Sequence, residues 1–155
     1  MPNFGYSVYG LDKDRTAIGS GRDVRCSAKM AREVCHTIKG MKLQRAKDYL
    51  EAVALLKAPV PFRRHNKKQA HRRGLKQFKW DAGRYPEKAA RKILEVLLNV
   101  ESNAEYKGLD TERCRIVHAA AQKARKIKRY IERAHGRSTA YFKQLTHVEI
   151  VLMEE

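Results

Sequence analysis

The last quarter of the chain decides the fold, and residues 114–152 read CRIVHAAAQKARKIKRYIERAHGRSTAYFKQLTHVEIVL. Side chains alternate in character over residues 114–119 and again over residues 147–152, a period of two that is typical of strands. Gly136 lies near the middle, where a hairpin reversal needs a residue that adopts positive φ without steric cost. The stretch therefore predicts two strands joined by a long hairpin, although residues 119–133 favour a helix on propensity alone.

The middle of this hairpin carries an unbalanced positive charge. Nine Lys or Arg and a single acid, Glu132, lie between Arg113 and Arg137, and neither Lys nor Arg follows Lys143. About 15 extended residues on each side reach on the order of 50 Å, well beyond the radius of a small domain. Such an arm has few apolar residues to bury, so we expect a partner lined with phosphates and stackable bases to order it.

Upstream of the hairpin, the apolar period changes from two to between three and four and predicts three helices. The first begins with Ser27 as N-cap and ends at Gly40, and the second extends over residues 46–56 until Pro59 forbids continuation. The third begins at Pro86 and carries its apolar stripe to about residue 107. We expect this third helix to be the core helix.

Two further segments complete the organisation of the chain. Residues 4–9 are rich in aromatic and β-branched residues and predict a short first strand, followed by a turn-rich segment that contains Gly19 and Gly21. Between Arg63 and Lys79 come eight Lys or Arg, two His and no acid, too much like charge for a self-contained packed helix. We interpret this second segment as an RNA-facing extension.

Composition limits the classes of protein that fit. The formal net charge is +17 on 155 residues, an excess that is tolerated mainly where phosphates neutralise it. A hydrophobic content of 43% supplies one core, and no apolar run approaches the roughly 20 residues that span a bilayer. The start of the chain does not resemble a signal peptide. The three cysteines lack metal-binding spacing, which predicts reduced, packed thiols in a cytosolic protein.

Candidate catalytic groups are few. Cys35 and His36 are adjacent, but neighbouring helical residues diverge by about 100° and cannot face one substrate. Asp12, Asp14 and Asp23 lie in the amino-terminal turn region without an evident partner for holding a metal. The sequence thus predicts no enzyme, no cofactor and no metal site. A free-standing architectural protein that binds DNA or RNA remains an alternative, because charge alone does not exclude it.

Aromatic residues accompany both basic segments. Tyr130, Tyr141 and Phe142 interleave with the cations of the arm, and four more aromatics, Phe62, Phe78, Trp80 and Tyr85, flank the earlier basic run. Rings of this kind stack on unpaired bases, while arginine binds phosphate bidentately. Each ring could equally pack on the domain itself. The combination of cations and rings is more specific for RNA than either is by itself.

Several of these segments resemble one known family. Residues 126–137 look like the hairpin tip, and residues 146–152 like the returning strand, of the universal large-subunit ribosomal protein twenty-two family. The helix that begins at Ser27 and the helix over residues 89–105 extend the resemblance over nearly the whole chain. The basic residues 62–79 and the run 83–86 look like the archaeal or eukaryotic branch.

The resemblance implies an α+β fold: a small globular domain of three helices packed on a short antiparallel sheet, with a long basic β-hairpin arm. It implies one domain over residues 1–155, with a basic extension at about 59–85 and the arm at about 113–153. The function implied is that of a structural constituent of the large ribosomal subunit, in the cytoplasm. It would bind large-subunit ribosomal RNA and stabilise its fold, contact neighbouring ribosomal proteins, and line the nascent-peptide exit tunnel.

Two sets of residues are expected to make these contacts. The RNA-binding set is Arg63, Arg64, Lys67, Lys68, Arg72, Arg73, Lys76, Lys79, Arg84, Lys123, Arg125, Lys126, Lys128, Arg129, Arg133 and Arg137. The hairpin tip, expected to meet the nascent polypeptide, is Arg129, Tyr130, Ile131, Glu132, Arg133, Ala134, His135, Gly136 and Arg137.

Overall fold

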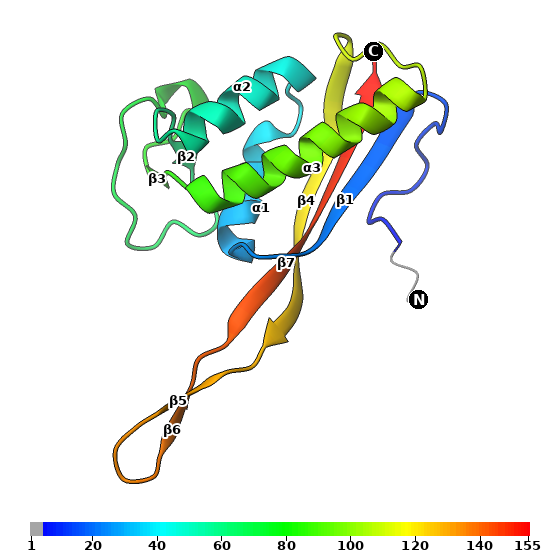
Figure 1. Cartoon of the computed structure of the whole chain (residues 1–155). Helices are drawn as coiled ribbons and strands as arrows, with labels where there is room; N and C mark the ends of the chain where they lie inside the picture. The colour runs from blue at the N-terminus through cyan, green and yellow to red at the C-terminus, as the bar shows by residue number, and fades with distance from the viewer. Residues whose placement is uncertain (1–4) are drawn as a thin grey trace.

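A three-stranded antiparallel sheet with the strand order β1-β7-β4 forms the centre of the computed structural model, which describes residues 5–155 (Figure 1). The strands are β1 (Thr16–Val24), β4 (Cys114–Ile127) and β7 (Lys143–Glu154). The last strand in sequence is therefore the middle strand of the sheet, and its side chains from Val148 to Leu152 are buried. Both strands expected from the alternating pattern are present, and they pair with each other.

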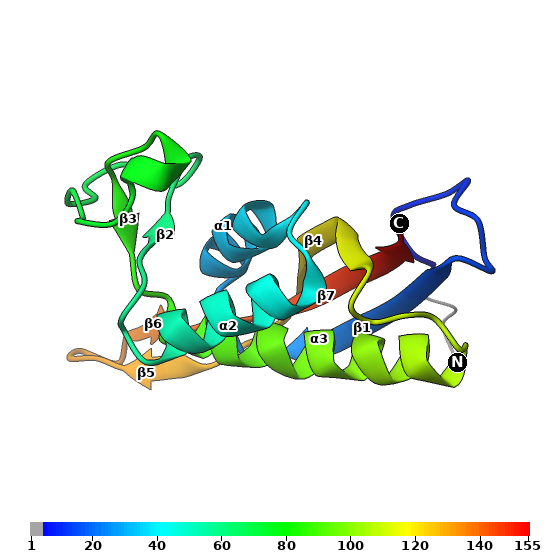
Figure 2. The ribbon, with the colours of Figure 1, turned by 90° about the horizontal axis from the view of Figure 1, so that it is seen from above.

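Three helices lie against one face of this sheet: α1 (Ala28–Ile38), α2 (Leu43–Ala54) and α3 (Glu87–Tyr106) (Figures 1 and 2). α1 packs on β4, α3 packs on β1 and β7, and α2 packs on α3. The apolar stripe of α3 is fully buried at Ala90, Ile93, Leu97, Val100 and Ala104. The α+β class and the core role of the third helix are thus confirmed.

The helix boundaries agree with the sequence signals, with differences at the caps. Ser27 is the N-cap of α1 by position, but its hydroxyl makes no capping hydrogen bond within the described residues. Gly40 has φ +83°, as a helix-ending glycine should. Pro86 occupies the N-cap of α3 rather than its first turn. Leu56, expected in the second helix, lies beyond its end, exposed and with φ +60°.

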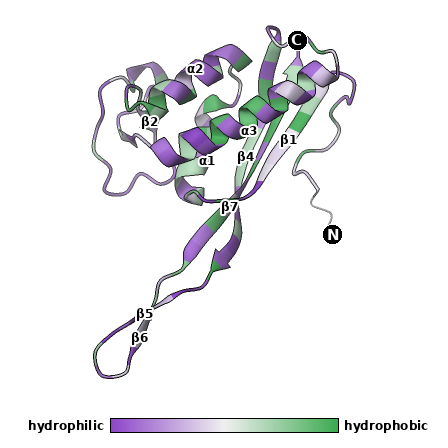
Figure 3. Ribbon diagram, viewed as in Figure 1, coloured by the Kyte–Doolittle hydropathy of each residue, from purple (hydrophilic) through white to green (hydrophobic). Residues whose placement is uncertain are grey.

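The hairpin leaves the domain as an arm (Figure 1). β4 and β7 pair as far as Ile127 and Lys143, and a second ladder, β5 (Tyr130–Glu132) with β6 (Ser138–Ala140), continues towards the tip. Figure 3 shows that most of this arm is hydrophilic. At the tip His135 and Gly136 have φ of +57° and +66°, so the reversal expected at Gly136 uses two residues in the left-handed region.

The basic segment between α2 and α3 has little regular structure. It contains the short pair β2 (Val60–Pro61) and β3 (Gly83–Arg84) and one 3-10 turn, η1 (Lys76–Phe78). Leu75 is fully buried, and Phe62 is nearly so, which fixes the segment to the domain at two points. The expectation that this segment is not a packed helix is confirmed.

The expectation for the amino terminus was wrong. Residues 5–9 form no strand, Phe4 lies outside the described residues, and Gly19 and Gly21 belong to β1 instead of a turn. The reason is a close approach of β1 to α3: a Cβ at Gly19 would lie 2.4 Å from Val100 Cγ2. These glycines lie within a strand and leave room for a helix to pack on it. The prediction of a turn at these positions was therefore wrong.

Candidate nucleic-acid interface

All sixteen cations of the RNA-binding set are exposed. Nine of them lie on the segment between β2 and α3, and the other seven follow the hairpin from β4 to the tip. The two groups are more than 35 residues apart in sequence between Arg84 and Lys123, yet both extend from the end of the domain at which α1 and α3 begin (Figure 1). The fold thus directs both groups of predicted RNA-binding cations outward from one end of the domain.

A buried carboxylate holds the start of the basic segment. Glu33, on α1, is fully buried, and the backbone N–H of Arg63 donates to its Oε2 at 3.0 Å. The N–H groups of Arg64 and His65 donate to Oε1 at 3.2 Å and 3.1 Å. Arg32 adds a salt bridge at 3.5 Å. Glu33 therefore fixes the direction in which the basic segment leaves the core.

Sequence reasoning missed Glu33. The available signal was an acid next to Val34 on the helix that packs on the sheet, since a charged side chain is rarely fully buried without partners. Its three donors lie 30 to 32 residues further along the chain. No local pattern identifies such partners, and only the folded chain brings them together.

Several aromatic residues of the basic segment pack on the protein itself. The Arg63 guanidinium lies 5.6 Å from the centre of the Trp80 ring and donates to the Phe78 carbonyl at 2.8 Å. The Trp80 indole N–H donates to the Phe62 carbonyl at 2.9 Å. These contacts order Arg63 before any RNA binds. One hydrogen bond and one ring contact of its planar group are therefore made within the protein.

The aromatic residues of the arm behave differently. Tyr130 is 62% exposed, Tyr141 54% and Phe142 43%, which are large values for residues of this type. Tyr130 and Phe142 form an edge-to-face pair with their ring centres 5.7 Å apart, so they meet across the arm. Every residue from 128 to 143 is exposed. The arm thus presents cations and ring faces together, with no core of its own.

One predicted RNA-binding cation, Arg125, has an acidic partner in the protein. The Nε of Arg125 donates to Oδ2 of Asp23 at 2.9 Å, and a second guanidinium nitrogen contacts the same oxygen. This hydrogen bond holds the pKa of Asp23 below its usual range. The pair joins β4 to the end of β1 where the hairpin leaves the sheet. Arg125 therefore contributes less free positive charge than its neighbours do.

The geometry does not support the catalytic hypotheses that the sequence analysis rejected. Cys35 is buried in the core and its neighbour His36 is exposed, so the two side chains diverge. Burial raises the pKa of Cys35 to about 12, which keeps this thiol protonated and unreactive at neutral pH. Cys26 and Cys114 are also free and buried, as expected. Within residues 5–155 no group of three metal-ligating side chains comes together. No helix in that part of the chain is long and apolar enough to cross a membrane.

Fold and charge together define a class of protein. A small α+β domain that extends a cationic hairpin and a cationic loop segment, both bearing exposed or partly ordered aromatics, is suited to a large structured polyanion. RNA suits both the cations and the aromatic rings, because it offers phosphates and unpaired bases together.

Comparison with known proteins gives the family within that class. Residues 19–153 match the model of the family described as ribosomal protein L22p/L17e, and the chain belongs to this family. It is 51% identical to the large ribosomal subunit protein uL22 of Archaeoglobus fulgidus, over 97% of this chain and 96% of that protein. It is 53% identical to the uL22 of Methanopyrus kandleri, over 93% and 90% of the two chains. With the uL22 of Hyperthermus butylicus the identity is 49% over essentially both whole chains. The expectation of the archaeal or eukaryotic branch is thereby confirmed, and these relatives are archaeal.

Proposed function

We propose that the chain is a structural constituent of the large ribosomal subunit that binds ribosomal RNA, stabilises its fold and lines the nascent-peptide exit tunnel with its hairpin tip. The family supports this function, as do relatives of nearly the same length that are named large ribosomal subunit proteins. The chain acts in the cytoplasm as part of the ribosome. It is a component of an assembly rather than an enzyme, and its role requires no cofactor.

The observation that carries the proposal is the exposure of the arm. Sixteen consecutive residues, 128–143, are exposed, although Tyr130–Glu132 and Ser138–Ala140 still pair as a hairpin. An isolated two-stranded hairpin is marginally stable in water, and three or more strands or a packed face are needed for independent stability. Self-repulsion among its cations weakens the arm further. RNA on both sides of the hairpin removes both costs, because phosphates neutralise the charge and bases cover the rings.

The basic segment at about 59–85 is the second RNA-binding element. Its cations face solvent, and the hydrogen bonds to Glu33 together with the buried Leu75 fix their placement. A preordered cationic loop loses less conformational entropy on binding than a disordered one. The sixteen cations then act in two groups on one RNA, the loop group near the domain and the arm group further out.

The tip, residues 129–137, is placed at the tunnel wall and contacts the nascent polypeptide. Arg129, Arg133 and Arg137 surround the reversal at Gly136 with exposed side chains. Side chains that face a polar, water-filled passage need no apolar cover. Neighbouring ribosomal proteins contact the remaining surface of the domain.

Sedimentation tests the main proposal. The tagged chain should migrate with the large subunit at moderate salt, whereas an architectural protein would follow bulk DNA or messenger RNA. Replacing Arg64 and Arg73 with Gln should flatten the slope of log affinity against log salt by up to about 0.9 per lost contact on duplex-like RNA. These two are chosen because Arg63 and Arg72 also stack on protein rings. An unchanged slope would mean that the cations only solvate a surface.

A crosslinking experiment tests the tunnel contact separately. A photoreactive group at Arg133 should crosslink to a stalled nascent chain, and deletion of residues 128–137 should remove contact while subunits still form. Subunits that incorporate the probe but never yield a crosslink to the nascent chain would place the tip elsewhere.

A further inference from the structure

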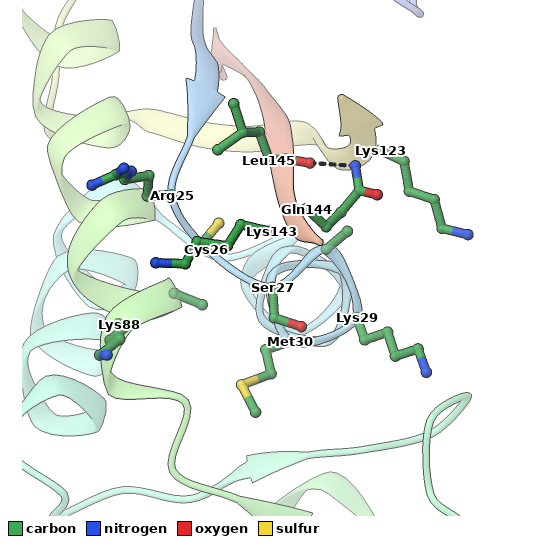
Figure 4. Close-up of a pocket in the computed structure, with 12 residues that line it drawn as sticks. Arg25, Cys26, Ser27, Lys29, Met30, Lys88, Lys123, Lys143, Gln144 and Leu145 are labelled. Carbon is green, nitrogen blue, oxygen red and sulfur yellow. Dashed lines mark hydrogen bonds between the residues drawn. The ribbon is translucent and has the colours of Figure 1, made fainter. Parts of the chain in front are cut away.

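A cavity of about 640 Å³ lies at the base of the hairpin, among side chains that the RNA-binding set leaves largely unassigned (Figure 4). Its walls come from the first turns of α1 and α3 and from β4 and β7 where the arm leaves the sheet. Cys26, Ala89 and Leu145 are nearly buried and form the inner wall with Met30, which packs against the core. We call this cavity the hairpin-base pocket. Its volume is in the range of about 300–1,000 Å³ that is typical of ligand sites.

The rim of the hairpin-base pocket is cationic. Arg25, Lys29, Lys88, Lys123 and Lys143 line it, all five are exposed, and no acid is among the described lining residues. Figure 4 shows Arg25 and Lys88 on one side of the opening and Lys29 and Lys123 on the other. None of the five forms a salt bridge within residues 5–155. Five unpaired cations around one opening repel one another, and an anion there relieves that repulsion.

A second cavity of about 500 Å³ adjoins the first turn of α1. It shares Ser27, Lys29 and Met30 with the hairpin-base pocket and adds the cations Arg64, Lys67 and Arg84 of the basic segment. Among their described lining residues neither cavity has an acid. The two cavities thus connect the basic segment to the hairpin by a continuous cationic path across α1, along which one RNA strand can run.

We propose that the hairpin-base pocket binds one unpaired nucleotide of ribosomal RNA, with its base on the apolar inner wall and its phosphates at the cationic rim. The inference rests on the proposed function and adds a specific site to it. A nucleotide combines a flat base that stacks on apolar surface with an anionic backbone, and the pocket offers both complements in one place. A duplex presents only its backbone and grooves, so it leaves the inner wall uncovered. An acidic peptide satisfies the rim but makes less use of the apolar wall.

Two variants separate the base contact from the phosphate contact. Ala28 lines the hairpin-base pocket and not the second cavity, so Ala28→Trp fills the space that the base would take. Lys29→Gln combined with Lys123→Gln removes charge on one side of the opening without adding bulk. Ser102→Trp is the matched control, because Ser102 is exposed on α3 about 20 Å along the helix from Lys88. Thermal unfolding of each purified full-length variant shows whether it folds.

The experiment maps base reactivity in large subunits that carry each variant. In subunits that carry wild type or Ser102→Trp, dimethyl sulfate and a 2′-hydroxyl acylating reagent should react only weakly with one nucleotide that is not base-paired. Its reactivity should rise by about fivefold or more in Ala28→Trp and in the double Gln variant, because a base that loses its apolar cover or its phosphate contacts is open to the reagents. After direct ultraviolet irradiation of the subunits, the same nucleotide should crosslink to a peptide that includes Cys26 or Met30.

Failure of this inference is distinguishable from failure of the proposed function. If variants sediment with the large subunit but no base changes reactivity, the pocket holds no nucleotide and the ribosomal role stands. Crosslinks from Met30 to a neighbouring protein instead of RNA would also overturn the proposal. A chain that never sediments with large subunits would remove both. Should Ala28→Trp fail to fold, the double Gln variant alone decides, since both its substitutions are on exposed residues.

Discussion

Replacing the buried Glu33 should destabilise the basic segment more than replacing any exposed acid would. In the native chain its two oxygens accept three backbone hydrogen bonds, from Arg63, Arg64 and His65 at 3.0–3.2 Å. Glu33→Ala leaves these three donors without their acceptor and opens a cavity on α1. Removing one partner of a buried charged network costs about 3–5 kcal/mol, a large part of the roughly 5–15 kcal/mol that stabilises a domain.

Glu33→Gln gives a finer measure of the same contact. The amide keeps the shape and one acceptor oxygen, so the N–H groups of Arg64 and His65 retain a neutral partner. Its NH2 group faces the Arg63 N–H, donor against donor, and that hydrogen bond is lost. Hydrogen bonds to charged groups contribute about 1.5–3 kcal/mol each, so we expect a loss of this size. The exposed Glu51→Gln changes the net charge equally and should cost less than about 0.5 kcal/mol.

The assay is urea unfolding of the full-length variants, followed by hydrogen exchange of the amides of residues 63–65. Both Glu33 variants should lower the free energy of unfolding, and those amides should exchange faster than in wild type. Without Glu33 the cations of the basic segment lose their fixed placement. The variants should therefore also bind RNA more weakly at fixed salt. A loss below about 1 kcal/mol for Glu33→Ala, with unchanged exchange at residues 63–65, would refute the anchoring role.

Four further predictions concern the rest of the chain. In the free protein the amides of residues 128–143 should exchange rapidly while those of α3 are protected, since only α3 has a buried face; hydrogen exchange with mass spectrometry measures both, and a protected arm in the monomer would contradict the exposed hairpin. The hydrogen bond from Arg125 lowers the pKa of Asp23 below its ordinary value of 3.8, so the pair's contribution is complete above that pH and lost as pH falls through the lowered pKa; a carboxyl NMR titration of Asp23 with a midpoint at or above 3.8 would count against the pair. With its pKa raised to about 12, Cys35 should be alkylated at pH 8 only as fast as the chain unfolds, and labelling at the rate of a free thiol would show that it is accessible. Gly83→Ala should cost about 1–3 kcal/mol in urea unfolding, because the new Cβ would lie 2.4 Å from the Val60 carbonyl oxygen, and an unaffected midpoint would mean that the backbone moves aside freely.

Much of the fold was predictable because its signals are local. The stripe of α3 repeats every three to four residues, so any helix formed there must bury one face. The strands around the arm alternate with period two, and Gly136 marks the reversal. The charge of the arm is equally a property of the sequence, since residues 126–137 contain too few apolar side chains to offset the burial of their cations in a domain.

The identity of the anchoring contacts was not predictable, because their partners are distant in sequence. Asp23 looked like a solvated acid of a turn, yet it lies at the end of β1 and pairs with Arg125, 102 residues further along the chain. Gly19 was expected to lie in a turn, yet it gives α3 room to approach the sheet. The sequence shows that a position carries a small or a charged side chain. The reason for that choice lies in the residues that surround it in the folded protein.

By itself, therefore, the sequence determined the class of the protein: three amphipathic helices, a paired hairpin and an excess of cations that requires a polyanion. Periodicity, glycine conformation and net charge are set by residues close together in the chain, and they hold in any compact fold that the chain adopts. Only the tertiary structure decided that β7 is the middle strand, that Glu33 fixes the basic segment, and that five cations surround one apolar cavity. These features depend on contacts between residues far apart in the chain, such as Glu33 with Arg63 and Thr16 with Met153, whose geometry exists only when the core has closed around α3.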